Sequence, residues 1–151
     1  MAYGSAAAVA GFARTWTRAG EWFDFDEVYN VASTNPSLTQ VESWLDEVSV
    51  MMDLALANEG FIVPVTQSEV IKALGAKVSA LVADLAHLAH NKGRLFSDRI
   101  QESGVDPMSI IDRDISAWVK RKVAGLEAMG VPRVIQQGSQ SAYSVPMGRQ
   151  T

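Results

Sequence analysis

Apolar residues recur at three- and four-residue spacing between Ser37 and Gly60, which predicts an amphipathic helix there. Ser37 carries the hydroxyl that often caps a helix start, and Gln40 follows three residues later, as in a capping box. Gly60 readily ends a helix. Residues 61–65 are then expected to be extended, because Pro64 lacks a backbone N–H and restrains the residue before it. The positions expected to face the core are Leu38, Val41, Trp44, Leu45, Val48, Met51, Met52, Ala55 and Leu56.

The same spacing predicts two further helices. One runs from a capping pair, Thr66 and Glu69, to about Asn91, and the other from Pro107 to Gly130. The first is apolar on one side and lined by alanines on the other, so we expect it to be the central helix, packed on both sides. Its alanines are Ala73, Ala76, Ala80 and Ala83; the core positions of the second are Met108, Ile111, Ile115, Trp118, Val119, Leu126 and Met129.

The N-terminal part is less regular. A short alanine-rich helix is predicted from Ser5 to about Trp16, with Val9, Phe12 and Trp16 buried. Residues 18–36 are predicted to be an ordered loop, with at most a short strand or helix. Aromatic residues in such a loop indicate packing, either on the chain's own core or on a partner subunit. They are Trp22, Phe23, Phe25 and Tyr29.

The C-terminal residues 131–151 have no helical period and contain prolines, glycines, Ser and Gln. We therefore expect a mostly α-helical domain over residues 1–130, a small bundle of three main helices, followed by a long extended arm. Some apolar residues of this arm could dock on a neighbouring surface, namely Val134, Ile135, Tyr143 and Val145.

Composition narrows the function classes. At 151 residues, 48% hydrophobic and 20% charged, the chain has the size and apolar content of one domain. It has no cysteine, which excludes disulfides, thiolate catalysis and cysteine-bound metal. Its longest apolar runs are far shorter than the roughly 20 residues of a membrane span, and no basic segment precedes the N-terminal alanines as in a secretory signal.

The net charge of −4 conceals an asymmetry. Ten acidic residues and no Lys or Arg lie between Ala19 and Ile71, while the rest of the chain holds the other seven acids and all thirteen bases. A chain with charges separated in this way is suited to head-to-tail contact between copies of itself. The alternative is that the charged side chains simply face solvent. Three acidic residues lie on one side of the helix that starts at Leu38, and we expect them to contact a neighbouring subunit or to line a channel. Four basic residues are expected to form a basic interface. The acidic residues are Glu42, Asp46 and Asp53, and the basic residues are Arg113, Lys120, Arg121 and Lys122.

No pattern predicts catalysis or a cofactor. His87 and His90 lie three residues apart, with Asp84 three before His87, but no further histidine and no HExxH motif completes a zinc site. Paired carboxylates support acid–base chemistry only in a cleft that separates their pKa values. No glycine-rich phosphate loop or nucleophile motif occurs, and the long proline-containing link after Gly60 is unlike a helix-turn-helix turn.

The sequence resembles the head-tail connector, or adaptor, proteins of tailed bacteriophages. The resemblance covers most of residues 3–130. It lies in the length and order of the segments and in the positions of the turns, and it includes no catalytic residue. The loop from Glu21 to Tyr29 departs from the family in its aromatic and acidic residues. The stretches that carry the resemblance are Tyr3-Gly4, Asn35 to Leu45, Val48-Ser49 and Gly60 to Thr66.

The resemblance implies a non-enzymatic virion protein of the neck, assembled in the host cytoplasm. Such a subunit forms a ring, commonly of twelve copies, under the portal protein; the ring extends the DNA channel and offers a surface to the next neck or tail protein. DNA passes without sequence-specific binding, and no cofactor or membrane is implied. The alternative is a small helical regulator that binds nucleic acid through residues 120–122.

Overall fold

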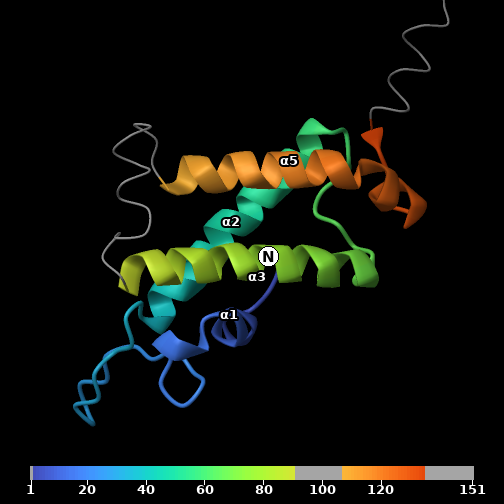
Figure 1. The fold of residues 1–151 in the computed structure, drawn as a ribbon. Coiled ribbons are helices and arrows are strands. Elements are labelled where there is room, and N and C mark those ends of the chain that lie inside the picture. Colours follow the sequence, from blue (N-terminus) through green and yellow to red (C-terminus); the bar gives the residue numbers. More distant parts are fainter. Residues whose placement is uncertain (1, 91–106, 135–151) are drawn as a thin grey trace, which may run out of the picture.

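In a computed structural model, which describes residues 2–90 and 107–134, the chain is mostly helical (Figure 1). Within this part, isolated β-bridges occur but no strand. The central helix α3 contacts each of the other helices, and α2 crosses it diagonally (Figure 1). The mostly α-helical class and the three long helices are therefore confirmed. The elements are α1 (Ala6–Phe12), a 3-10 turn η1 (Arg14–Trp16), α2 (Leu38–Asn58), α3 (Ser68–His90) and α5 (Pro107–Ala128).

Helix α2 begins and ends at the expected residues. The Ser37 hydroxyl oxygen accepts a hydrogen bond from the Gln40 amide at 3.2 Å, and Gly60 takes the left-handed conformation (φ 89°) that follows the last turn. The expected apolar face is buried or half-buried throughout, with four side chains at 0% exposure. These four are Val41, Val48, Met52 and Leu56.

Helix α3 is central, but two details differ from expectation. It begins at Ser68, two residues beyond Thr66, and Glu69 pairs with Lys72 at 3.1 Å. Of the four alanines, Ala83 is buried and Ala80 half-buried as expected, but Ala73 and Ala76 are exposed, and a close backbone approach occurs at Gly75. A Cβ at Gly75 would lie 3.0 Å from the backbone nitrogen of Gly4, so the absent side chain leaves room for the N-terminal segment.

The N-terminal segment ties several elements together through Tyr3, which is 3% exposed. Its hydroxyl donates to Asp53 Oδ1 at 2.6 Å and accepts from the Val65 amide at 3.2 Å. Its backbone N–H donates to Ser49 Oγ at 2.8 Å. Residue 3 therefore fixes the start of the chain to α2 and to the link between α2 and α3.

Two expected core residues are exposed. Phe12 is 54% exposed, because α1 packs through the small residues Ala10 and Ala13 together with Val9. Met129 is 51% exposed, because α5 ends at Ala128 and the following turn carries it outward. Predicted burial thus failed at the ends of helices, where the periodic pattern no longer fixes direction.

The chain stays attached to the helical core beyond residue 130. Val131 is 4% exposed, and the Ile62 amide donates to the Pro132 carbonyl at 2.9 Å. The arm residues Ile135, Tyr143 and Val145 lie outside the described residues. None of the helices that are described has the length and apolarity needed to cross a membrane.

We predict that Tyr3→Phe lowers the free energy of unfolding by about 1–3 kcal/mol at neutral pH, since it leaves a buried amide without its acceptor. Burial and the bond to Asp53 raise the pKa of the Tyr3 hydroxyl from 10.0 to about 12. The folded state thus holds this proton more tightly, so wild-type stability should fall as the pH rises from 10 to 12.

Chemical denaturation across this pH range measures the effect, and the alkaline loss should be smaller in Tyr3→Phe. The control is Tyr29→Phe, because Tyr29 is 77% exposed. Equal pH profiles for wild type and Tyr3→Phe would contradict the prediction.

Candidate functional site

Residues 24–32 form a hairpin, named here the tip hairpin. The backbone amides and carbonyls of Asp26 and Val31 exchange two hydrogen bonds, of 2.8 and 3.0 Å. Asp26 Oδ1 also accepts from the amides of Val28 at 3.0 Å and Tyr29 at 3.2 Å, and Asn30 closes the turn with φ 50°. The shape of the hairpin is therefore fixed by its own local bonds.

The base of the tip hairpin is attached to the first turn of α2. Asp24 accepts from the Thr39 amide at 2.8 Å and from the Thr39 hydroxyl at 2.7 Å. These bonds, the backbone one foremost, hold the pKa of the Asp24 carboxyl below its usual value. On the other side, Arg18 Nη2 donates to the Ala32 carbonyl at 2.7 Å. The hairpin is thus held from both sides.

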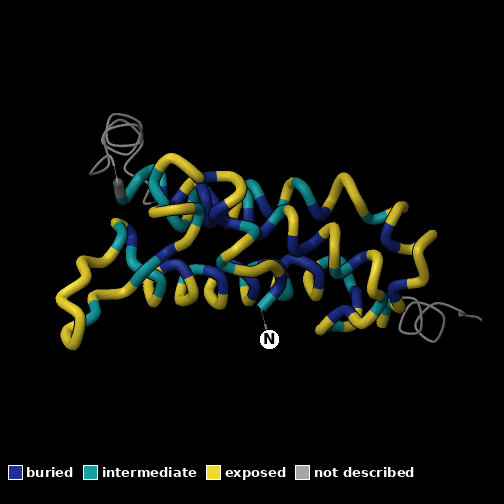
Figure 2. Tube along the Cα trace, turned by 90° about the horizontal axis from the view of Figure 1, so that it is seen from below, coloured by how far each residue is buried: buried dark blue, intermediate teal, exposed yellow. Residues whose placement is uncertain are grey.

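The aromatic loop divides into a packed part and an exposed part. Trp22 is 4% exposed and donates from Nε1 to the Ala6 carbonyl at 3.1 Å; Phe23 lies under the Arg18 guanidinium, 4.4 Å from its ring centre. By contrast, Phe25 is 55% exposed and Tyr29 77%. Figure 2 shows the loop as an exposed stretch projecting beyond the helices. Packing on the chain's own core is therefore confirmed for Trp22, while contact of Phe25 and Tyr29 with a partner subunit stays a prediction.

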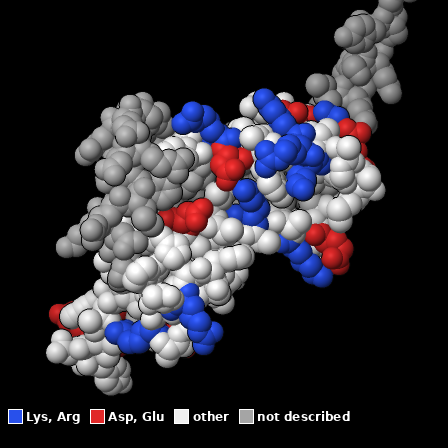
Figure 3. Space-filling model, viewed as in Figure 1, with Lys and Arg blue, Asp and Glu red and all other residues white. Residues whose placement is uncertain are grey.

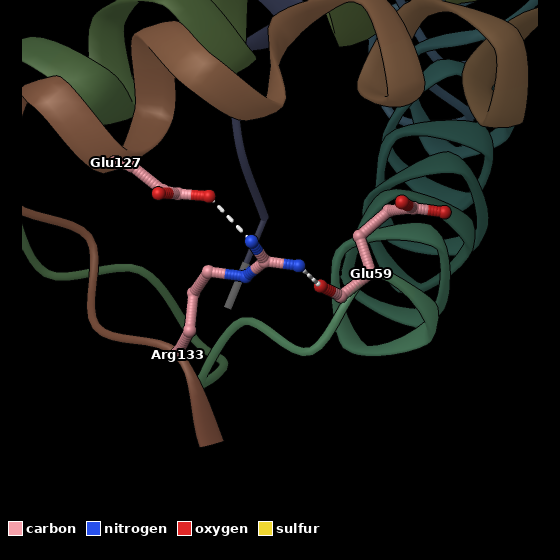
Figure 4. Close-up of polar contacts among 3 residues, drawn as sticks. All are labelled: Glu59, Glu127 and Arg133. Carbon is pink, nitrogen blue, oxygen red and sulfur yellow. Dashed lines mark hydrogen bonds and ion pairs between the residues drawn. The ribbon is translucent and has the colours of Figure 1, made fainter. Parts of the chain in front are cut away.

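At the end of the molecule opposite the tip hairpin, Arg133 links the segment after α5 to the end of α2 (Figure 4). Its Nη2 donates to the Glu59 carbonyl at 2.5 Å, its Nη1 pairs with the Glu127 carboxylate, and its guanidinium lies 5.0 Å from the Phe61 ring centre. The Val134 amide donates to the Gly60 carbonyl at 2.6 Å. Sequence reasoning missed this contact; its one signal is an isolated arginine soon after α5.

This end also exposes apolar side chains. Ile62 is 43% exposed, Met129 51% and Val134 55%. We call these three residues the exit surface. Val134, expected to contact a neighbour, is thus available for such contact, although its backbone is paired within the chain.

Helix α2 connects the two ends. The tip hairpin is bonded to its first turn at Thr39, and Arg133 is bonded to the residue that follows its last turn, Glu59. At 1.5 Å per residue, 21 helical residues span about 30 Å. Figures 1 and 2 both place the hairpin and the chain's exit at opposite ends of an elongated molecule. The two surfaces are therefore held apart by one rigid helix.

The predicted acidic stripe is split. Glu42 and Asp46 are exposed, whereas Asp53 is half-buried and accepts the hydrogen bond of Tyr3. Spacing along α2 puts all three on one side, but only contact with the N-terminal segment separates their roles. Asp53 therefore holds the N-terminal segment in place, whereas Glu42 and Asp46 remain accessible on the surface of α2.

The four predicted basic residues are all exposed on α5. The Lys122 ammonium lies 6.0 Å from the Trp118 ring centre. Figure 3 shows Lys and Arg side chains gathered over α5 toward the exit end, with acidic side chains beside them; the hairpin end shows both basic side chains and a small acidic patch on this face. We call Lys120, Arg121 and Lys122, with Trp118, the basic face.

His87 has a structural role. Its Nδ1 accepts from Trp16 Nε1 at 2.5 Å, and the two rings meet edge-on with centres 5.8 Å apart. Over residues 2–90 and 107–134, no group of three or more side chains could hold a metal ion. The pKa of the Asp84 carboxyl is raised, chiefly by burial and further by Asp114, beside a pocket of about 320 Å³ between α3 and α5. Among the described residues, apolar side chains form most of the lining of that pocket, and Asp84 and Asp114 are its two carboxylates.

Comparison with protein-family models, with curated proteins and with solved structures found no match for this chain.

Asp24→Ala should loosen the tip hairpin from α2, because it removes both bonds from Thr39. We expect amide hydrogen exchange at Val31 and Thr39 to become several-fold faster. The same loosening is expected in the wild type as the pH falls through the lowered pKa of Asp24, since protonation weakens the acceptor. Glu27→Ala is the control, and unchanged exchange in Asp24→Ala would disprove this attachment.

Arg133→Ala should lower the free energy of unfolding by about 1–3 kcal/mol, because it leaves the Glu59 carbonyl and the Glu127 carboxylate without their donor. Arg133→Lys should recover part of this loss, since an ammonium cannot reach both acceptors as a planar guanidinium does. Arg113→Ala, at an exposed position, should change stability by less than about 0.5 kcal/mol. Thermal or urea denaturation of the three variants checks the ranking.

Proposed function

We propose that this protein is a non-enzymatic structural adaptor that forms a ring between the portal and the next neck or tail protein of a bacteriophage virion. The observation that carries the proposal is the pair of apolar surfaces at opposite ends of α2. A bridging subunit needs two contact surfaces at a fixed separation, and a 21-residue helix with one buried face supplies that separation. Exposed apolar side chains grouped on projecting segments are typical of protein-binding surfaces.

The resemblance to head-tail connectors supports the same role. In that family twelve copies are common, and genomic DNA passes through the ring. Exposed carboxylates such as Glu42 and Asp46 would repel the phosphate backbone if they lined the channel, so DNA could slide without adhering. The chain beyond Val134 would be an arm that contacts the portal or an adjacent subunit.

A second candidate function, binding of nucleic acid, is favoured by one observation. Lys120, Arg121 and Lys122 are all exposed, and the Lys122 ammonium lies 6.0 Å from the ring centre of the half-buried Trp118. Phosphate binding by such a cluster would weaken steeply with salt, because binding releases counterions. Salt-dependent binding of duplex DNA by the isolated monomer would favour this candidate, and no binding at low salt would remove it.

The adaptor proposal is tested by mixing the protein with the portal protein encoded in the same genome. Mass photometry should detect a complex that carries many copies of this chain, and negative-stain images should show an added layer on one side of the portal. Portal with an unrelated helical protein of similar size is the control. A chain that stays monomeric and never joins the portal would disprove the proposal.

A further inference from the structure

We propose that the tip hairpin of one copy docks on the basic face of α5 in the next copy. This inference rests on the proposed function for the existence of a ring and goes beyond it by naming both halves of the contact between subunits. The partner is therefore a second copy of this chain, joined head to tail.

The tip hairpin has the properties of an inserting element. Val28 is 84% exposed and Tyr29 77%, although their backbone amides are already held by Asp26. Burying both side chains would remove apolar area from water with little further loss of backbone freedom. Tyrosine is also a residue type that often dominates binding energy at interfaces. The tip is thus ordered before binding and exposed where binding would occur.

Charge selects the surface that would receive it. The Asp24 carboxylate is bonded to Thr39 of α2 and the Asp26 carboxylate to amides of the hairpin, but Glu27 is exposed between Asp26 and the two apolar tip residues. The basic face offers Lys122, whose ammonium lies 6.0 Å from the ring centre of the half-buried Trp118, together with the exposed Lys120 on the same turns of α5. An acidic tip with a tyrosine would meet a base beside an aromatic ring, so charge and apolar contact agree.

The position of the two surfaces makes the contact heterologous. The tip hairpin projects at one end of the molecule, and the basic face gathers toward the other (Figures 1 and 3). They cannot meet within one chain. A contact between two different surfaces joins copies head to tail, and it closes into a ring when the rotation between copies allows.

Two complementary full-chain variants test this contact. The hairpin variant, Val28→Ser with Tyr29→Ser, keeps its basic face, and the charge variant, Lys120→Glu with Lys122→Glu, keeps its hairpin. All four positions are exposed, so both variants should fold, which circular dichroism and thermal unfolding check. The matched control is Val50→Ser with Leu54→Ser, which replaces two exposed apolar residues near the middle of α2.

Alone, each complementary variant should have a dissociation constant for self-association at least about tenfold weaker than that of the wild type. The control should associate like the wild type. Mixed together, the two variants should form a one-to-one dimer in analytical ultracentrifugation and grow no further, because one intact hairpin meets one intact basic face and no other pair remains. No dimer in the mixture, or a hairpin variant that associates like the wild type, would overturn the inference.

The outcomes separate this inference from the proposed function. If the wild type joins the portal but the mixture forms no dimer, the named contact is wrong and the adaptor role stands. If the mixture forms the dimer but the wild type never joins the portal, the contact is correct and the adaptor role is wrong.

Discussion

The buried face of α2 is the constraint on which the rest of the molecule depends. Four of its side chains are fully buried against the neighbouring helices, so the helix cannot bend or rotate without exposing them. Ser37 and Gly60 fix where it begins and ends. Whatever is bonded to those two ends is consequently held at a fixed separation.

The start of the chain strengthens this arrangement. Tyr3 is hydrogen-bonded to α2 at Ser49 and Asp53, and to the link at Val65, so one residue closes the space between three segments. The fit depends on small residues, because a Cβ at Gly4 would lie 2.9 Å from the Gly75 carbonyl oxygen. The link between α2 and α3 is therefore a fixed element of the core, even though it is not helical.

The rigid core determines where apolar side chains are exposed on the surface. Apolar side chains are exposed at both ends of the molecule, in the acidic tip hairpin at one and in the exit surface, beside Arg133, at the other. The described residues hold no metal-binding group, and their polar contacts mainly fix backbone and helix ends. This distribution suits a protein whose work is contact with other proteins.

The sequence by itself determined the helices, because capping and periodicity act within a few residues: Ser37, Gly60 and the apolar spacing were enough to predict α2. Tertiary structure alone decided the roles of side chains that meet across long separations. Asp53 became an anchor rather than part of an acidic stripe, and Arg133 closed the far end, through contacts 50 and 74 residues apart in sequence. Phe12 is exposed because the buried side of α1 is formed by Val9 and Ala10. Local spacing specifies which face of a helix is apolar, whereas the packing of distant segments decides which polar groups remain free for function.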